Sequence, residues 1–283
     1  MKDSITLYNH FHNGDIFFSR PIINLLKNHF NIDFYHNQNI PLFLDIPEIN
    51  EFKGIPQNFN YTDHFIKTIK NGIINTWIGQ PGYINRINSG CSFENHMELT
   101  KEICDYFSIR ITNYDDCLPE VNFENLPNFK LIEKIMLDYK QKFKKIVLIS
   151  NGDVNSGQSP NFDFFPIIQN LSTSNSDILF IVTKSVNEIN KNIVNIEKIT
   201  NTYPDLLYIS QISTYCDVIV GRASGPYCFT QLKNNLLDSN KTYISFNNDI
   251  NEGRFYSNLK SKFVWSNNYE QENIIKTITN NLF

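Results

Sequence analysis

Two turns rich in small residues, one in each half of the chain, carry side chains that could do chemistry. The later turn follows the apolar run Val218–Val220 and reads Gly221-Arg222-Ala223-Ser224-Gly225-Pro226. A strand that ends in such a turn before a helix presents unpaired backbone N–H groups that favour an anion. The guanidinium of Arg222 suits a phosphate, and we expect the helix to begin near Phe229–Leu232. An ordinary strand–helix turn with a surface arginine is the alternative interpretation.

The earlier turn follows a predicted strand at Ser4–Tyr8 and holds His10, His12 and Asp15. At a helix start Asp15 would serve as the N-cap, and the same carboxylate could take the proton of an attacking hydroxyl. His10 and His12 could hydrogen-bond to a substrate or to Asp15. A zinc site would need a third ligand nearby, so we expect no metal. Arg20 could contact an acidic acceptor or stay solvated.

A third polar loop follows the clearest predicted strand, Lys145–Ser150, and includes Asn151, Gly152 and Ser159. Gly152 and Gly157 fit neither a P-loop nor a dinucleotide fingerprint, because the required spacing and the Gly-Lys-Ser/Thr run are missing. Backbone and hydroxyl donors of such a loop can still hold a diphosphate. A flexible surface loop is an equally weighted alternative.

Other catalytic signatures are missing from the sequence. No Gly-x-Ser-x-Gly elbow occurs, which weakens a hydrolase interpretation. The pair Asp115-Asp116 lacks the Asp-x-Asp spacing of many metal-dependent sugar transfers. We therefore expect a metal-independent site without a cofactor, in which cations and helix termini stabilise a leaving diphosphate.

Composition limits the class of protein. The 283 residues are 41% hydrophobic, enough for one large domain or two ordinary ones. A net charge of −4 argues against general nucleic-acid binding. The five cysteines include no CxxC pair, so neither a zinc site nor a disulfide framework is expected. No apolar run approaches the roughly 20 residues of a membrane span, which favours a soluble, cytoplasmic protein whose membrane contacts would be peripheral.

The spacing of apolar residues predicts strands that alternate with helices in both halves of the chain. The predicted strands are 4–8, 32–35, 73–78, 145–150, 177–183, 206–209, 218–220 and 242–246. The predicted helices are 16–30, 96–107, 131–143, 164–171 and 269–282.

This alternation predicts an α/β fold made of two Rossmann-like domains that face each other across a cleft. The Pro-containing stretch 111–129 would connect them, which gives an N-terminal domain over 1–130 and a C-terminal domain over 131–283. Ligands of doubly wound sheets bind beyond the carboxyl ends of the strands. The polar loops described above fall at those ends.

Two segments resemble a known family. The run His12–Pro21, followed by Leu25-Leu26-Lys27, resembles the Gly-Asp…Pro…Leu-Lys opening of heptosyltransferase-type glycosyltransferases of the GT-B fold. Asp217–Pro226 resembles the second signature of that family, in which a strand ends in a Ser/Thr-Gly-Pro-like turn. The resemblance implies that Asp15 is the base. It also implies that the donor diphosphate is held by Ala223, Ser224 and Gly225.

The chain departs from the family pattern at two places. Arg222 and Ala223 stand where family members carry an acidic residue or Asn followed by Ser/Thr. Tyr227 and Cys228 stand where the following helix usually begins with a histidine. The resemblance therefore bears on fold and reaction type more than on the identity of the sugar.

The combined expectation is an inverting, metal-independent glycosyltransferase that moves a sugar from a nucleotide-activated donor to a glycan or other hydroxyl acceptor. Domain 1–130 would hold the acceptor, with Asp15 as general base and His10 or His12 orienting it. Domain 131–283 would bind the nucleotide-sugar donor through Asn151, Gly152, Ser159, Arg222, Ala223, Ser224, Gly225 and Pro226. Two alternatives remain: a sugar-nucleotide epimerase or hydrolase on the same scaffold, and a non-catalytic nucleotide-sugar- or carbohydrate-binding protein.

Overall fold

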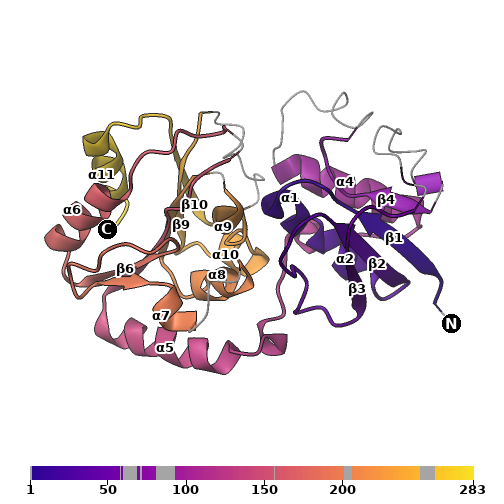
Figure 1. Cartoon of the computed structure of the whole chain (residues 1–283), viewed down its shortest axis with the longest axis horizontal. Coiled ribbons are helices and arrows are strands. Elements are labelled where there is room, and N and C mark those ends of the chain that lie inside the picture. The colour runs from indigo at the N-terminus through magenta and orange to yellow at the C-terminus, as the bar shows by residue number, and fades with distance from the viewer. Residues whose placement is uncertain are drawn as a thin grey trace. The chain divides into compact units, whose positions relative to one another are not determined.

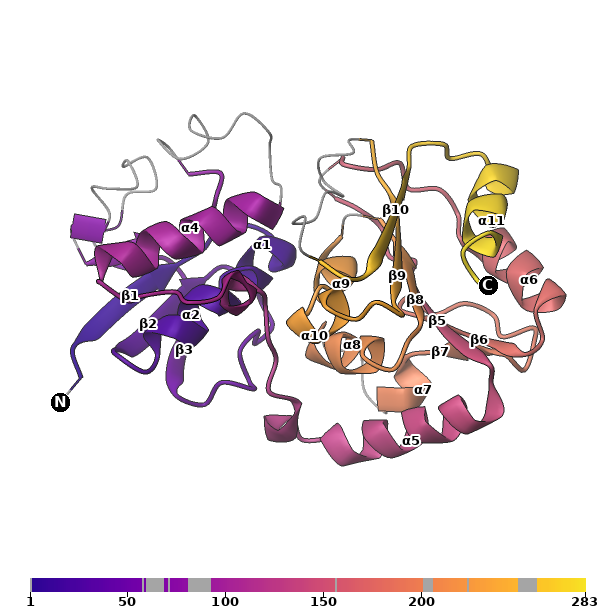
Figure 2. The ribbon, with the colours of Figure 1, turned by 180° about the vertical axis from the view of Figure 1, so that it is seen from behind.

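The chain folds into two compact units, the first ending at Asn125 and the second beginning at Leu126. A computed structural model describes residues 2–57, 59, 69–70, 72–80, 93–155, 157–200, 206–222, 224–248 and 259–283. The change of unit falls a few residues before the division at 130/131 inferred from the sequence. Figures 1 and 2 show both units from opposite sides.

The first unit contains a four-stranded parallel sheet in the order β3-β2-β1-β4. Its strands are β1 (Ser4–Tyr8), β2 (Asn31–His36), β3 (Ile49–Lys53) and β4 (Ile73–Asn75). The chain moves outward from β1 to β3 and then returns to pair β4 with the opposite side of β1. The strand order therefore reverses between β1 and β4, where Tyr8 lies opposite Asn75.

The second unit contains a six-stranded parallel sheet in the order β10-β9-β8-β5-β6-β7. Its strands are β5 (Lys145–Ser150), β6 (Ile178–Val182), β7 (Ile193–Asn195), β8 (Val218–Gly221), β9 (Thr242–Phe246) and β10 (Lys262–Ser266). Numbered from β5, this is the 3-2-1-4-5-6 order of the Rossmann fold. The order reverses between β5 and β8, where Ser150 pairs with Gly221.

Helices cover both faces of the second sheet. Helices α6 and α11 pack on one face, and their apolar side chains share a core with β5, β6, β8 and β9. Helices α8, α9 and α10 lie on the other side of the sheet (Figures 1 and 2). The central strands are buried almost throughout, which explains their uninterrupted apolar sequences. The helices are α1 (Asn13–Phe17), α2 (Arg20–Leu26), α4 (Phe93–Tyr106), α5 (Phe129–Lys142), α6 (Phe165–Ser174), α7 (Glu197–Thr200), α8 (Leu206–Ser213), α9 (Gly225–Cys228), α10 (Lys233–Leu236) and α11 (Gln271–Thr279).

The single helix expected over 16–30 is wrong, because two short helices, α1 and α2, occupy this region. Pro21 lies in the first turn of α2. It has no N–H to donate to the carbonyl four residues earlier, and its ring would clash there, so one continuous helix cannot pass through it. The break falls at Phe18 and Ser19, just after the short helix that carries Asp15.

Three other expectations about elements need correction. The strand expected at 206–209 is the start of helix α8, all of whose side chains are buried, so no polar face marks its helical period. The helix expected to begin at 229–232 is wrong, because these residues form the connection between α9, which ends at Cys228, and α10, which begins at Lys233. The strand expected at 73–78 ends at Asn75. Strands β3, β7 and β10 were not predicted.

Candidate functional site

The first candidate site is the point where the strand order of the first sheet reverses. From β1 the chain runs through residues 9–12 into α1, and from β4 it runs through residues 76–80. Both segments leave the carboxyl end of a parallel strand, which is where doubly wound sheets bind ligands. His10, His12 and Asp15 therefore all follow the carboxyl end of β1, at this edge of the sheet.

Buried polar side chains connect these two segments. The Asn9 side-chain N–H₂ donates to the backbone oxygen of Asp15 (3.2 Å) and to Ser19 Oγ (3.3 Å), while Asn9 Oδ1 accepts from the Phe11 backbone N–H (3.1 Å). The Ser19 and Thr76 hydroxyls are 2.7 Å apart. Asn9 and Thr76 were missed by sequence reasoning. They fix the backbone on either side of Asp15.

Asp15 is a partly buried carboxyl on helix α1. His12, rather than Asp15, occupies the N-cap position of α1, so the capping role expected for Asp15 is wrong. Burial raises the pKa of Asp15 to about 6, against the opposing effect of the nearby His12 ring. A carboxylate with this pKa is ionised at pH 7 and is a stronger base than an ordinary aspartate.

His10, Phe11 and Trp77 form an aromatic cluster at the same edge of the sheet. The Phe11 and Trp77 rings stack with their centroids 4.3 Å apart, and the His10 ring meets the Trp77 ring edge-on at 5.1 Å. The Trp77 ring also lies against Gly79, where a Cβ atom would be 2.1 Å from it. Burial lowers the pKa of His10, which favours the neutral ring at pH 7.

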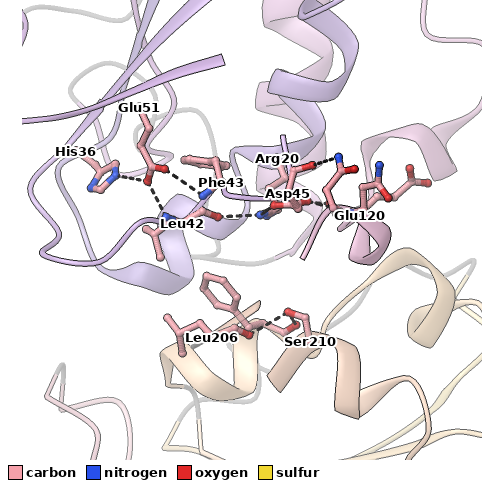
Figure 3. A network of polar contacts seen from close by, with 12 residues as sticks. Arg20, His36, Leu42, Phe43, Asp45, Glu51, Glu120, Leu206 and Ser210 are labelled. Atoms are coloured by element: carbon pink, nitrogen blue, oxygen red, sulfur yellow. Dashed lines mark hydrogen bonds and ion pairs between the residues drawn. The ribbon is translucent and has the colours of Figure 1, made fainter. Parts of the chain in front are cut away.

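Arg20 is neither solvated nor open to a ligand. Its guanidinium is fully buried and binds the Asp45 carboxylate through two bonds of 2.8 and 2.6 Å. It also donates to the carbonyls of Leu42 (2.8 Å) and Glu120 (3.0 Å). Figure 3 shows this network beside the Glu51 carboxylate, which holds the Leu42 N–H. Arg20 therefore has a structural role within the first unit.

The second candidate site is the corresponding reversal point of the second sheet, between β5 and β8. The Ser150 and Ser224 hydroxyls are 3.3 Å apart there, and Gly225 and Pro226 form the first turn of α9. The predicted binding residue Ala223 lies outside the described residues. The predicted turn residues Ser224, Gly225 and Pro226 thus lie at the carboxyl end of β8, where an anion would be bound in this fold.

Gly221 is required because its neighbours leave no room for a side chain. A Cβ atom there would lie 2.7 Å from the Tyr227 ring and 2.9 Å from Ser150 Cβ. We expect Gly221→Ala to lower the free energy of unfolding by about 1–3 kcal/mol, measured by urea denaturation. Gly152→Ala is the matched control, since a Cβ atom there meets nothing within 4 Å. Equal stabilities of the two variants would contradict this close packing.

Arg222 is a buried cation and not the surface arginine of the alternative interpretation. Its side chain donates to the carbonyls of Pro160 (3.3 Å) and Asn151 (3.2 Å) and to Asn161 Oδ1 (3.0 Å). The guanidinium carbon lies 4.9 and 5.0 Å from the ring centroids of Phe162 and Phe164.

This environment stabilises the Arg222 charge without neutralising it. Burial lowers the pKa of Arg222, whereas the charge of Asp153 acts in the opposite direction. No carboxylate lies within ion-pair distance of Arg222 among the residues described here. An arginine remains protonated even so, which leaves a positive charge under the β8 turn.

A cavity of about 560 Å³ adjoins Arg222 between the loops that follow β5 and β6. Its volume is within the range of small-molecule sites. Asn151 joins the two loops, because its amide accepts from the Lys184 backbone N–H (2.7 Å) and donates to the Lys184 carbonyl (2.7 Å). The Lys184 ammonium pairs with Asp153 at the cavity wall (2.8 Å). The cavity is therefore a preformed space next to a buried cation.

Gly152 and Ser159, the other predicted residues of this loop, are not among the residues that line the cavity. Gly152 follows Asn151 directly and has open space around its Cα. Ser159 is buried, and its hydroxyl donates to the Pro160 carbonyl (3.3 Å). Their predicted contacts to a donor remain predictions.

No described helix is long and apolar enough to cross a membrane. In the same part of the chain, no three His, Cys, Asp or Glu side chains are grouped as metal ligands would be.

Comparisons with known proteins concern the fold. No family model and no curated protein matches this sequence. The structure is similar to that of a glycosyl transferase family 9 protein from Veillonella parvula DSM 2008, with a TM-score of 0.53, 10% identity, and coverage of 98% of this chain and 96% of the other. Two structures with lower TM-scores were also found. One is ADP-heptose lps heptosyltransferase II of E. coli, with a TM-score of 0.47, 10% identity and coverage of 98% of each chain. The other is a putative UDP-N-acetylglucosamine 2-epimerase of Listeria monocytogenes, with a TM-score of 0.47, 10% identity, and coverage of 98% of this chain and 87% of the other.

The first of these similarities spans nearly the whole chain, and both sheets of this chain are parallel, with helices between their strands. The expected α/β fold is confirmed. This chain has the fold of GT-B glycosyltransferases.

Proposed function

We propose that this protein is a glycosyltransferase that moves a sugar from a nucleotide-activated donor to a glycan or other hydroxyl acceptor. One observation carries the proposal. The two turns that sequence analysis selected lie at the reversal points of two separate parallel sheets, the Asp15 turn beside β4 and the Arg222 turn beside β5. Such points are the ligand sites of doubly wound folds. The GT-B fold supports the same conclusion.

The donor would bind to the second unit. Its diphosphate would lie against the turn from Arg222 to Pro226, where the Arg222 charge has no carboxylate partner among the described residues. The adjoining cavity, which Asn151 lines, would take the nucleoside, and Gly152 would contact the donor from the next position in the loop. A fixed positive charge beneath the diphosphate also stabilises the leaving group as the glycosidic bond breaks. This arrangement needs no metal ion, and metal independence remains part of the proposal.

The acceptor would bind to the first unit. As its hydroxyl oxygen bonds to the anomeric carbon, the bond from that carbon to the diphosphate oxygen breaks, and the hydroxyl proton passes to Asp15. A single displacement of this kind inverts the anomeric configuration. His10 and His12 would orient the acceptor. The proposal retains the sequence-based expectations that both units serve one reaction and that the reaction takes place in the cytoplasm.

Arg222→Met should weaken donor binding by about 10- to 100-fold, because a hydrogen bond to a charged group contributes roughly 1.5–3 kcal/mol. Isothermal titration calorimetry with the nucleotide sugar or its nucleoside diphosphate measures this loss. Arg222→Lys keeps a charge and should lie between Met and the natural residue. If a folded Arg222→Met variant binds the nucleotide as tightly as the natural protein, Arg222 does not contact the diphosphate.

The function itself is tested with a panel of nucleotide sugars, first by thermal shift and then by turnover. We expect one donor class to stabilise the protein and to release its nucleoside diphosphate only when a hydroxyl acceptor is present. Donor cleavage without an acceptor would favour a hydrolase, and an isomerised donor would favour an epimerase. Tight binding without turnover across all acceptors would favour a carbohydrate- or nucleotide-binding protein.

A further inference from the structure

Trp77 is placed to act on Asp15. Trp77 follows the carboxyl end of β4, at the reversal point of the first sheet. The preceding residue, Thr76, hydrogen-bonds to Ser19. Phe11 stacks on its indole ring and Gly79 lies against it, so the ring has little freedom to rotate. A rigid ring at this edge of the sheet can hold a catalytic side chain in one orientation.

The indole N–H of Trp77 is a buried donor. Nε1 is buried and makes no hydrogen bond of standard geometry within the described residues. It is nevertheless close enough to the Asp15 carboxyl to lower the pKa of that group, as a donor facing an acceptor does. An indole N–H can only donate, and a buried donor without an acceptor is costly. Trp77 follows β4 and Asp15 follows β1, so both lie at the edge of the sheet where these paired strands end. A carboxylate is the strongest class of acceptor for such a donor.

We propose that Trp77 is a positioning residue, whose indole N–H donates to the Asp15 carboxylate and holds its second oxygen toward the acceptor hydroxyl. Its role in turnover rests on the proposed function. The hydrogen bond does not, because it can be measured without any substrate. Trp77 matches neither motif of the family resemblance, and the sequence offered no signal for it.

Histidines on its own turn and on α4 are titratable groups among the described residues near Asp15. On its own turn, the His12 charge lowers the pKa of Asp15, and burial lowers the pKa of His10. From α4, the buried His96 ring stacks on Phe18 at 4.4 Å, and burial lowers the pKa of His96 to about 3, so it is uncharged at neutral pH. Residues 73–80, on the β4 side, contain no charged side chain.

The substrate-free test is the titration of Asp15 by carboxyl ¹³C NMR. The indole N–H stabilises the ionised carboxylate in the natural protein. Trp77→Phe keeps an aromatic ring but removes this N–H. The pKa of Asp15 should therefore rise from about 6, by roughly one unit. Trp265→Phe is the matched control, since Trp265 is the other tryptophan of the chain and its N–H donates to the Asn247 carbonyl in the second unit. An unchanged or lowered Asp15 pKa in folded Trp77→Phe would overturn the proposal.

A second measurement leaves the site intact. In Trp265→Phe, Trp77 is the only tryptophan, so its fluorescence reports on Asp15 directly. We expect its emission to change with a midpoint near pH 6 and expect Asp15→Asn to remove that change. A pH response that persists unaltered in the Asp15→Asn background would overturn the contact. Failure of every transferase assay would leave both of these measurements valid, so the two proposals can fail separately.

In turnover, Trp77→Phe should shift the acid limb of the kcat/KM profile upward by the same roughly one unit. The variant would then lose up to about tenfold below pH 6 and little at pH 8, where Asp15 is ionised in both proteins. A purely structural role predicts an equal loss at every pH. That result would contradict positioning through the carboxylate.

Discussion

Replacement of Asp15 by Asn should reduce sugar transfer by about 10²- to 10⁴-fold and leave donor affinity unchanged. This is the size of the rate loss expected when a general base is removed. The variant should keep the turn, because Asn9 holds the backbone oxygen of Asp15 and not its side chain. Steady-state kinetics gives the first quantity and calorimetry the second. Asp3→Asn, an exposed aspartate of the same unit, is the control and should be fully active.

The pH dependence of the natural enzyme should follow the same group. Activity should rise with pH through about 6, as Asp15 loses its proton, and this limb should be missing from the residual activity of Asp15→Asn. If Asp15→Asn retained the turnover and pH profile of the natural protein, Asp15 would not be the base.

Asp15 should also lower stability at neutral pH. Its pKa in the folded protein, about 6, lies above that of an unfolded aspartate. Asp15 therefore contributes most to the free energy of unfolding at a pH below its pKa in the unfolded chain. This contribution is lost as the pH rises through its pKa in the folded protein. The Asn variant should consequently have a higher melting temperature than the natural protein at pH 8, with a smaller difference at pH 4. Such a gain is expected for a group kept for chemistry rather than for folding.

Arg20→Met should lower the free energy of unfolding of the first unit by about 3–5 kcal/mol, the usual cost of breaking a buried ion pair from one side. The change leaves the Asp45 carboxylate buried with only backbone partners such as the Asn122 N–H (2.9 Å). It also removes the donor to Leu42 and Glu120. Urea denaturation followed by circular dichroism measures the effect.

The matched control for this change is Lys27→Met. Lys27 and Glu48 form a partly exposed pair at 3.6 Å, which should contribute at most about 1 kcal/mol. Replacing both members of the buried pair, in Arg20→Met with Asp45→Leu, should recover part of the loss because no charge is then stranded. Similar stabilities of Arg20→Met and Lys27→Met would show that the buried network is not the anchor inferred from its geometry.

Local sequence patterns predicted the central strands well. Strands β1, β5 and β9 have the expected bounds, because each is a short apolar or alternating run that ends in polar residues. The edge strand β10, Lys262–Ser266, is only partly buried and was missed, because its apolar run Phe263–Trp265 is only three residues long. Helix α8 was wrongly predicted as a strand because all of its side chains are buried. It therefore lacks the polar face that distinguishes a helix from a buried strand.

The candidate sites were predicted only where one segment carries the whole signal. The Gly14-Asp15 motif marks its turn by itself, whereas Trp77 reaches the same edge through the pairing of β1 with β4. Arg222 was recognised as a cation in a turn. Its burial depends on Phe162 and Phe164, some sixty residues earlier in the chain. Contacts of this kind come from sheet topology, which local spacing does not encode.

The central claim is that a nucleoside diphosphate binds where β5 and β8 end, and amide chemical-shift mapping of the full chain tests it most directly. On titration with UDP, ADP or GDP, we expect one nucleotide to shift the backbone N–H signals of Asn151, Arg222, Ser224 and Gly225, and Arg222→Met to weaken that response. Shifts confined to the first unit, or no response to any of these nucleotides at millimolar concentration, would contradict the account.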